Sequence, residues 1–196
     1  MDVVGYWWPA EPPGWEPPSR LLDFLASGPP PVYVGFGSMS PGDPERLGHL
    51  VAGALKLAGC RGVVHSGWAG LHVCGDDVLT VDEVPHSWLF PRMAAVVHHA
   101  GAGTTAAGLR AGVPVVPVPV MLDQRFWASR LASLAVGPGV VPFRRLTAPL
   151  LAEAVRRAVR EERYARRARE VAAVVRGEDG AGRVVAAVER LGGPGG

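Results

Sequence analysis

The sequence predicts an α/β protein with a doubly wound, Rossmann-like parallel sheet. Short apolar runs of strand length alternate along the chain with longer segments in which apolar residues recur at helical spacing. Of the 196 residues, 48% are hydrophobic and 19% are charged, which is typical of a globular domain with a sizeable core. Apolar strands alternating with helices are buried on both faces, as in parallel sheets.

The first 30 residues differ in composition from the rest. Trp7, Trp8 and Trp15 lie among five prolines between residues 9 and 18. Proline favours extended backbone, and large aromatic side chains seldom stay in water. We predict a linker or arm over residues 1–30 that docks through its tryptophans, with a short helix at 20–26, followed by one domain over residues 31–196.

Regular alternation begins at residue 31. Pro44 and Asp43 mark the start of the first long helix, because proline suits the first turn and aspartate caps it. The predicted strands are 32–36, 62–65, 78–81, 93–97, 113–118 and 139–142. The predicted helices are 44–58, 104–111, 123–134, 147–159, 163–175 and about 182–191.

Bulk composition argues against several classes of function. The net charge of +2 is too small to indicate a nucleic-acid partner. Two cysteines do not form a disulfide framework, and no secretory signal opens the chain. The most apolar stretch, residues 113–122, contains three prolines and is too short to span a membrane. We therefore expect a cytoplasmic protein.

The most informative stretch is His98-His99-Ala100-Gly101-Ala102-Gly103-Thr104-Thr105, which joins a predicted strand to a predicted helix. The first N–H groups of a helix are unpaired and carry partial positive charge, and glycines let an anion approach the backbone. The stretch therefore predicts a phosphate or diphosphate site, to which a histidine can add a hydrogen-bond donor. A tight turn without a ligand is the alternative.

Two further features are expected at the same sheet edge. Ser38 follows the first strand in a glycine-rich turn, and Asp123 and Gln124 follow the proline-rich strand. Ligands of open parallel sheets bind at the carboxyl ends of the strands. A hydroxyl can hydrogen-bond a phosphate, and a carboxylate with an amide suits sugar hydroxyls. Together the features favour a sugar nucleotide.

Residues 101–106 also fit the dinucleotide fingerprint G-x-G-x-x-A, so an NAD(P)-type Rossmann domain is an alternative, although that fingerprint normally follows the first strand.

Arginines alternate with glutamates over 153–170, which predicts a solvated helix face, with nucleic-acid or membrane contact as the alternative. We predict no metal site, because the spacing of Cys60, His65, His72 and Cys74 fits no common zinc motif.

Three motifs resemble those of family 1-type nucleotide-sugar glycosyltransferases, which have the two-domain GT-B fold. They are VPHSWLFP at 84–91, HHAGAGTTAAGLRAGVP at 98–114 and DQRFW at 123–127. The likeness is greatest to sterol 3-beta-glucosyltransferase-like enzymes, with glycopeptide and macrolide glycosyltransferases nearby. It covers essentially the whole chain but only the C-terminal, donor-binding half of such an enzyme. It implies that an N-terminal acceptor domain holds the catalytic base, so that none lies in this chain. It also implies that His98 and His99 both face the donor phosphates.

The resemblance implies an inverting, metal-independent hexosyltransferase that uses a UDP-sugar, with UDP-glucose expected, and a hydroxyl of a lipid or natural product. It implies no cofactor, and the chain alone should bind donor without transferring sugar. A non-catalytic sugar-nucleotide-binding subunit of a split enzyme is a further alternative. By position, the resemblance assigns phosphate contacts to Ser38, His99, Gly101, Ala102, Gly103, Thr104 and Thr105. It assigns contacts with the base or ribose to Val84, His86 and Trp88, and contacts with the sugar to Asp123 and Gln124. Glu83 and Ala107 replace a tryptophan and a glutamate of the plant enzymes.

Overall fold

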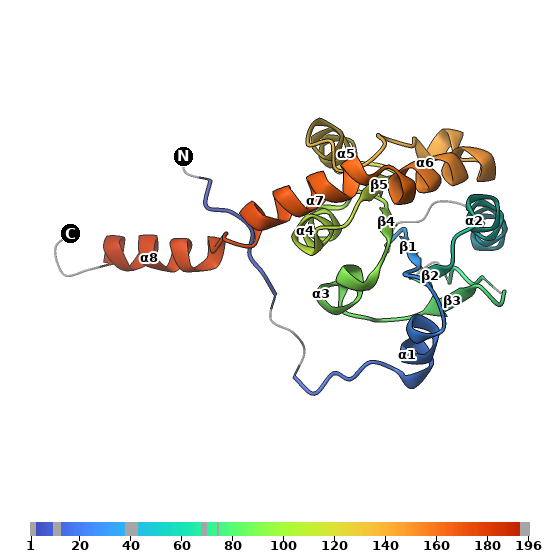
Figure 1. The fold of residues 1–196 in the computed structure, drawn as a ribbon. Coiled ribbons are helices and arrows are strands. Elements are labelled where there is room, and N and C mark those ends of the chain that lie inside the picture. Colours follow the sequence, from blue (N-terminus) through green and yellow to red (C-terminus); the bar gives the residue numbers. More distant parts are fainter. Residues whose placement is uncertain (1–2, 10–12, 38–42, 68–69, 74, 193–196) are drawn as a thin grey trace.

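A parallel sheet forms the centre of the fold in a computed structural model that describes residues 3–9, 13–37, 43–67, 70–73 and 75–192. The strand order is β3-β2-β1-β4-β5, and every neighbouring pair is parallel. The predicted doubly wound architecture is thus confirmed (Figure 1). The strands are β1 (Val32–Gly35), β2 (Gly62–His65), β3 (Val78–Val81), β4 (Ala95–His98) and β5 (Val115–Pro117).

Alternate residues of a strand point into hydrophobic clusters on opposite faces of the sheet. Val32 and Val34 of β1 pack against α2 and α6, whereas Tyr33 packs with α1 and α3 on the opposite face. Helix α4 also covers that face, α7 packs on α4, and α5 contacts β5. The helices are α1 (Ser19–Ala26), α2 (Pro44–Ala58), α3 (His86–Leu89), α4 (Ala102–Ala111), α5 (Gln124–Ser133), α6 (Ala148–Arg160), α7 (Glu162–Val175) and α8 (Gly180–Gly192).

The sheet order fixes where a ligand crevice lies. The chain passes from β1 outward to β3 and then returns to place β4 on the other side of β1. Connections therefore leave β1 and β4 in opposite directions, and the crevice outside their carboxyl ends is where open α/β sheets bind ligands. Gly35 at the end of β1 is paired with His98 at the end of β4. The two glycine-containing turns predicted to form the site follow these residues.

The predicted Asp43 cap of α2 is confirmed, and α6 begins with a further side-chain cap. Asp43 Oδ1 accepts hydrogen bonds from the N–H groups of Glu45 and Arg46 at 2.9 and 3.4 Å. The Thr147 hydroxyl caps α6 by accepting from Leu150 N–H. Each cap satisfies an N–H that the helix itself leaves unpaired. These two helices pack together on one face of the sheet.

The strand predicted at 139–142 is wrong. Val141 N–H donates to Pro117 O at 3.0 Å, so the segment runs beside β5. Pro117 and Pro119 have no N–H to return a hydrogen bond, and a ladder therefore does not form. Three short helices were also missed: α3 and the 3₁₀ turns Phe90–Arg92 and Phe143–Arg145.

Trp8 and Trp15 of the N-terminal arm pack on the domain as predicted, whereas Trp7 is 65% exposed. Trp8 Nε1 donates to Glu178 O at 3.0 Å, and the Arg110 guanidinium lies 4.5 Å from the Trp8 ring centroid. Farther along, Trp15 meets Trp88 edge to face at 5.4 Å. The arm thus contacts the junction of α7 and α8 first and α3 later. Helix α8 extends away from the body of the domain (Figure 1).

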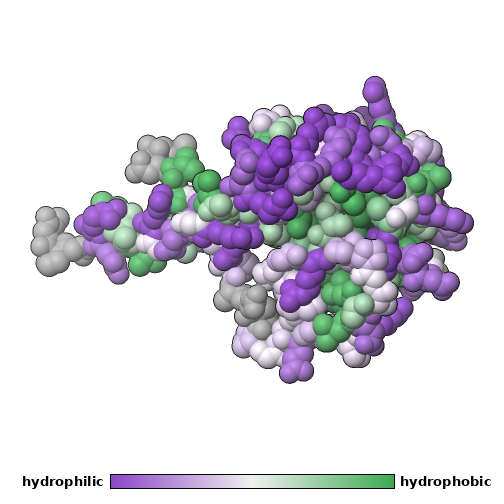
Figure 2. Space-filling view, viewed as in Figure 1, coloured by the Kyte–Doolittle hydropathy of each residue, from purple (hydrophilic) through white to green (hydrophobic). Residues whose placement is uncertain are grey.

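Arginine and glutamate residues pair along α6 and α7. Arg157 binds Glu161 at 2.7 Å, and Arg167 binds Glu170 at 2.9 Å. Exposed pairs of this kind contribute little to stability but keep a helix face solvated. Figure 2 shows a largely hydrophilic surface over this part of the molecule, as the charge pattern predicts. Among the residues described, no helix is long and apolar enough to cross a membrane.

Candidate diphosphate and sugar site at the carboxyl edge of the sheet

The turn between β4 and α4 presents the start of α4 to the crevice. Gly101 is the N-cap of α4 and provides no side chain to cap it. The first helical hydrogen bond runs from Thr105 N–H to Gly101 O at 2.8 Å. The N–H groups of Ala102, Gly103 and Thr104 therefore precede the helical ladder and have no partner within it. Three adjacent amides at a helix start can hold an anion.

The buried His98 side chain supports the turn between β4 and α4. The structure corrects the expectation that both histidines face a ligand, because His98 is fully buried. His98 is the last residue of β4 and lies within the covered sheet, whereas His99 lies in the turn that follows. His98 Nδ1 accepts a hydrogen bond at 2.9 Å from the N–H of Ala100, whose φ is 64°. This bond supports a left-handed conformation that alanine seldom adopts.

His99 lies between two glycines of different turns. A Cβ atom built on Gly37 would stand 2.7 Å from His99 Cε1, and one on Gly101 would stand 2.5 Å from His99 Nε2. Neither position has room for a larger residue while the ring keeps its place. The imidazole is thus seated across the switch point between β1 and β4. Ser38, the other predicted phosphate contact, lies outside the described residues.

Burial sets the charge of the histidines around the crevice. Burial lowers the pKa of His99. A hydrogen bond to the Gly35 backbone and the nearby Asp123 carboxylate oppose this effect in part. Burial likewise lowers the pKa of His65, and lowers that of His86 to about 4. These imidazoles are neutral at pH 7, so the positive potential of the free site comes from the start of α4.

Gly103 is a glycine that the fold itself does not require. It is exposed in the first turn of α4, and a Cβ atom built there would meet nothing within 4 Å. Alanine would favour the helix more than glycine does. A ligand that approaches the amides closely is one physical reason to keep this position free of a side chain.

Asp123 and Gln124 occupy the start of α5, but their side chains differ in role. Asp123 is exposed, and its Oδ2 accepts from Trp127 Nε1 at 3.0 Å. Gln124 is buried, and its Oε1 accepts from the N–H groups of Val120 and Met121 at 2.8 and 3.0 Å. The carboxylate thus faces outward, whereas the amide oxygen fixes the loop that carries it.

Two other predicted contacts are restricted by burial. The Thr105 hydroxyl is buried, and the Thr105 N–H donates within α4. Residues 101–104 therefore remain as the candidate anion contacts in this turn. Val84 is a core residue, so only its backbone can meet a nucleotide. His86 is half-buried, stacks on Phe90 and lies 3.3 Å from the Tyr33 hydroxyl through Nε2. Trp88 is half-buried beneath the Arg92 guanidinium.

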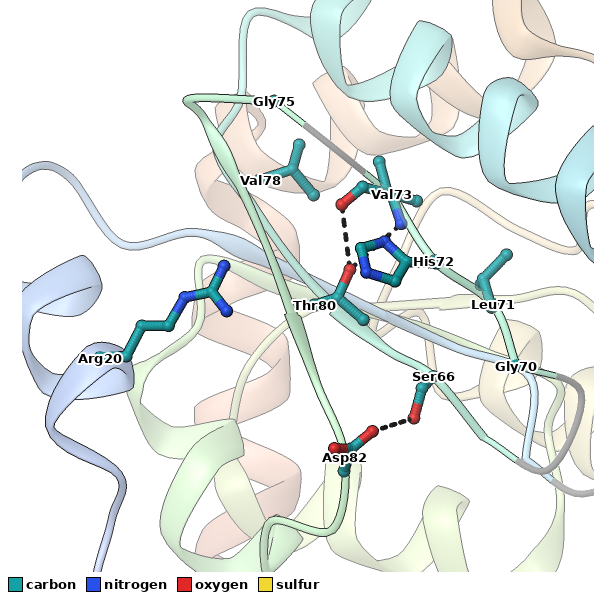
Figure 3. Close-up of a pocket in the computed structure, with 10 residues that line it drawn as sticks. All are labelled: Arg20, Ser66, Gly70, Leu71, His72, Val73, Gly75, Val78, Thr80 and Asp82. Carbon is teal, nitrogen blue, oxygen red and sulfur yellow. Dashed lines mark hydrogen bonds between the residues drawn. The ribbon is translucent and has the colours of Figure 1, made fainter.

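A pocket of about 440 Å³ adjoins the site along β2 and β3 (Figure 3). Ser66 and Asp82, which directly follow these strands, are joined by a 2.7 Å hydrogen bond on one side of it. Arg20 of α1 lines it from the side opposite Leu71. This pair was not predicted from the sequence, although each of these two polar residues directly follows one of two neighbouring strands.

Comparisons with known proteins agree on one family. A family model described as "Erythromycin biosynthesis protein CIII-like, C-terminal domain" matches residues 69–191. A sterol 3-beta-glucosyltransferase of Arabidopsis thaliana is 39% identical over 194 residues, which is 97% of this chain and 31% of that protein. The O-mycaminosyltylonolide 6-deoxyallosyltransferase of Streptomyces fradiae is 43% identical over 180 residues, covering 91% of this chain and 42% of that enzyme.

Solved structures show the same fold. The glycosyltransferase of kitacinnamycin superimposes with a TM-score of 0.76 at 21% identity, covering 96% of this chain and 48% of that one. The glycosyltransferase VinC, solved in complex with DTDP, gives a TM-score of 0.68 at 26% identity, covering 86% of this chain and 44% of that one. This chain therefore spans less than half the length of each relative compared here.

Proposed function

Because the chain belongs to the erythromycin CIII-like C-terminal domain family of glycosyltransferases, with the Rossmann-like fold of one half of a GT-B enzyme, we propose that it binds the sugar-nucleotide donor. The proposed reaction is inverting and metal-independent, and it moves a hexose from a UDP-sugar, UDP-glucose in particular, to a hydroxyl of a lipid or natural product. The observation that carries the proposal is the uncapped start of α4 beside His99, with the Asp123 carboxylate at the same edge.

The proposed chemistry follows from where charge develops. When the anomeric carbon is attacked, negative charge accumulates on the departing diphosphate. The amides of residues 102–104 and the His99 ring would stabilise that charge without rearrangement. A base must also take the acceptor proton. His98 is fully buried, so it cannot serve. We assign the base to the part of the enzyme outside this chain.

Residues 101–104 and His99 form the proposed diphosphate cradle, with Ser38 as a further proposed contact. Asp123 is the proposed sugar contact, and Gln124 holds the loop beside it. His86, Trp88 and the backbone of Val84 are proposed to border the base and ribose. The VinC complex supports a nucleoside diphosphate as the ligand of such a domain. No group of three or more metal-binding side chains occurs among the residues that the structure describes.

The ligand class is tested by calorimetry on this chain. We expect UDP and UDP-glucose to bind in the presence of EDTA, with UDP-glucose the tighter, because the cradle supplies its own positive potential and Asp123 adds a sugar contact. NAD should bind much more weakly. Tight NAD binding without a UDP response would favour the dinucleotide-binding alternative instead.

Gly103→Ala tests whether the diphosphate approaches the amides of α4. The free energy of unfolding should stay equal or rise by up to about 1 kcal/mol, because alanine favours the helix and the site has room. UDP affinity should fall at least about tenfold, since the added methyl group keeps the anion from the amides. Urea titration and calorimetry measure the two effects. Gly53→Ala in α2, where a Cβ atom has ordinary contacts, is the control that should leave UDP affinity unchanged. Undiminished UDP binding by Gly103→Ala would place the anion elsewhere.

A further inference from the structure

The orientation of Asp123 is unusual for a residue at the start of a helix. It occupies the N-cap position of α5, where an aspartate usually accepts hydrogen bonds from the free backbone amides. Asp123 makes no such cap. Its Oδ2 instead accepts from the indole N–H of Trp127 at 3.0 Å, one helical turn away. The bond occupies one oxygen, and a carboxylate has further acceptor positions on the other.

Trp127 is itself held by the N-terminal arm. Its ring centroid lies 6.2 Å from that of Tyr6 and 5.2 Å from that of Phe126. Tyr6 in turn lies 5.3 Å from Trp8. A residue of the arm, more than 100 positions earlier in the sequence, therefore packs against the side chain that contacts the proposed sugar-binding carboxylate.

The arm is fixed where it passes the junction of α7 and α8. Tyr6 N–H donates to Glu178 Oε2 at 3.0 Å, and Gly180 N–H donates to Tyr6 O at 3.2 Å. Together with the Trp8 indole, which donates to Glu178 O, these bonds fix the arm at Tyr6 and Trp8. The arm and Gly180 are closely packed, because a Cβ atom on Gly180 would lie 2.5 Å from Gly5 O. Figure 1 shows the arm running beside this junction.

We propose that Trp127 is a positioning residue that orients the Asp123 carboxylate toward the donor sugar, and that the arm keeps Trp127 in place through Tyr6. The inference rests on the proposed role of Asp123 as the sugar contact. A free carboxylate on an exposed helix start rotates among several orientations, and ordering it costs binding free energy. A prior hydrogen bond from the indole reduces that cost. The diphosphate cradle is not part of this contact chain.

Trp127→Phe tests the proposal, because it removes the indole N–H and keeps an aromatic ring against Tyr6. UDP affinity should stay within about twofold of the wild type. The preference for UDP-glucose over UDP should fall at least about fivefold. Trp127→His, which restores a ring N–H, should recover part of the preference. Phe126→Leu is the control, because Phe126 contacts the Trp127 ring from an exposed position and should leave the preference unchanged.

The outcomes separate this proposal from the proposed function. A wild-type chain without any preference for UDP-glucose over UDP would remove the sugar-contact role of Asp123 and this proposal with it. A wild-type preference that Trp127→Phe retains would overturn the positioning role alone. Equal losses of UDP and UDP-glucose affinity in both Trp127 variants would also overturn it, since they would show a structural role for the ring.

Discussion

His99→Ala is expected to weaken UDP and UDP-glucose alike, by about 10- to 100-fold. Both ligands carry the diphosphate, and the imidazole is seated against the turn that presents the α4 amides. Losing a hydrogen bond to a charged group costs about 1.5–3 kcal/mol, and each 1.4 kcal/mol is a tenfold change in affinity. Calorimetry with the two ligands measures the effect. His49→Ala on the exposed side of α2 is the control that should bind like the wild type.

Asp123→Asn, compared in the same titrations, separates the sugar contact from the phosphate contact. Asparagine keeps an oxygen that can accept from Trp127 Nε1, so the local structure should persist. UDP affinity should change little, and the added affinity of UDP-glucose should fall. A His99→Ala variant that weakened only UDP-glucose, or an Asp123→Asn variant that weakened UDP equally, would contradict the division of roles.

The fold was predictable where local chemistry and tertiary packing agree. β2, β3 and α2 match their predicted bounds, because their residues combine strong periodicity with clear boundaries such as Asp43 and Gly59. The segment 139–142 has the apolar composition of a strand, but Pro117 and Pro119 beside it lack the N–H groups that a hydrogen-bonded ladder needs. Helix α3 was missed because Pro85 and Pro91 enclose only four helical residues, too few to show a helical period.

The candidate site was predictable in outline but not in the direction of its side chains. The glycines between a predicted strand and a predicted helix indicated the candidate anion site, and the structure places them at the start of α4. Which of His98 and His99 is accessible depends on where β4 ends, because His98 is its last residue and is fully buried. The contrast between Asp123 and Gln124 depends on a loop conformation, and the contact of Trp127 with Tyr6 joins distant parts of the chain. Sequence spacing contains no signal for such contacts.

Acid should destabilise the fold well above the pH at which most carboxylates titrate. Burial lowers the pKa of His86 to about 4 and that of His98 to about 3, from 6.5 for an unperturbed histidine. The folded state therefore binds these protons less readily than the unfolded state. The stability contribution is complete above pH 6.5 and is lost as the pH falls toward 4 and then 3. At pH 5, which is 1.5 pH units below 6.5, each histidine costs about 2 kcal/mol.

Urea titrations at pH 7.5 and 5 should therefore show a fall of at least about 4 kcal/mol in the free energy of unfolding, because the lowered pKa values of His65 and His99 act in the same direction. His86→Phe removes one titrating group while keeping an aromatic ring to stack on Phe90, so its loss between the two pH values should be smaller by about 2 kcal/mol. His49→Gln, at an exposed position, should lose as much as the wild type. A His86→Phe variant as acid-sensitive as the wild type would show that His86 is not neutral in the folded state.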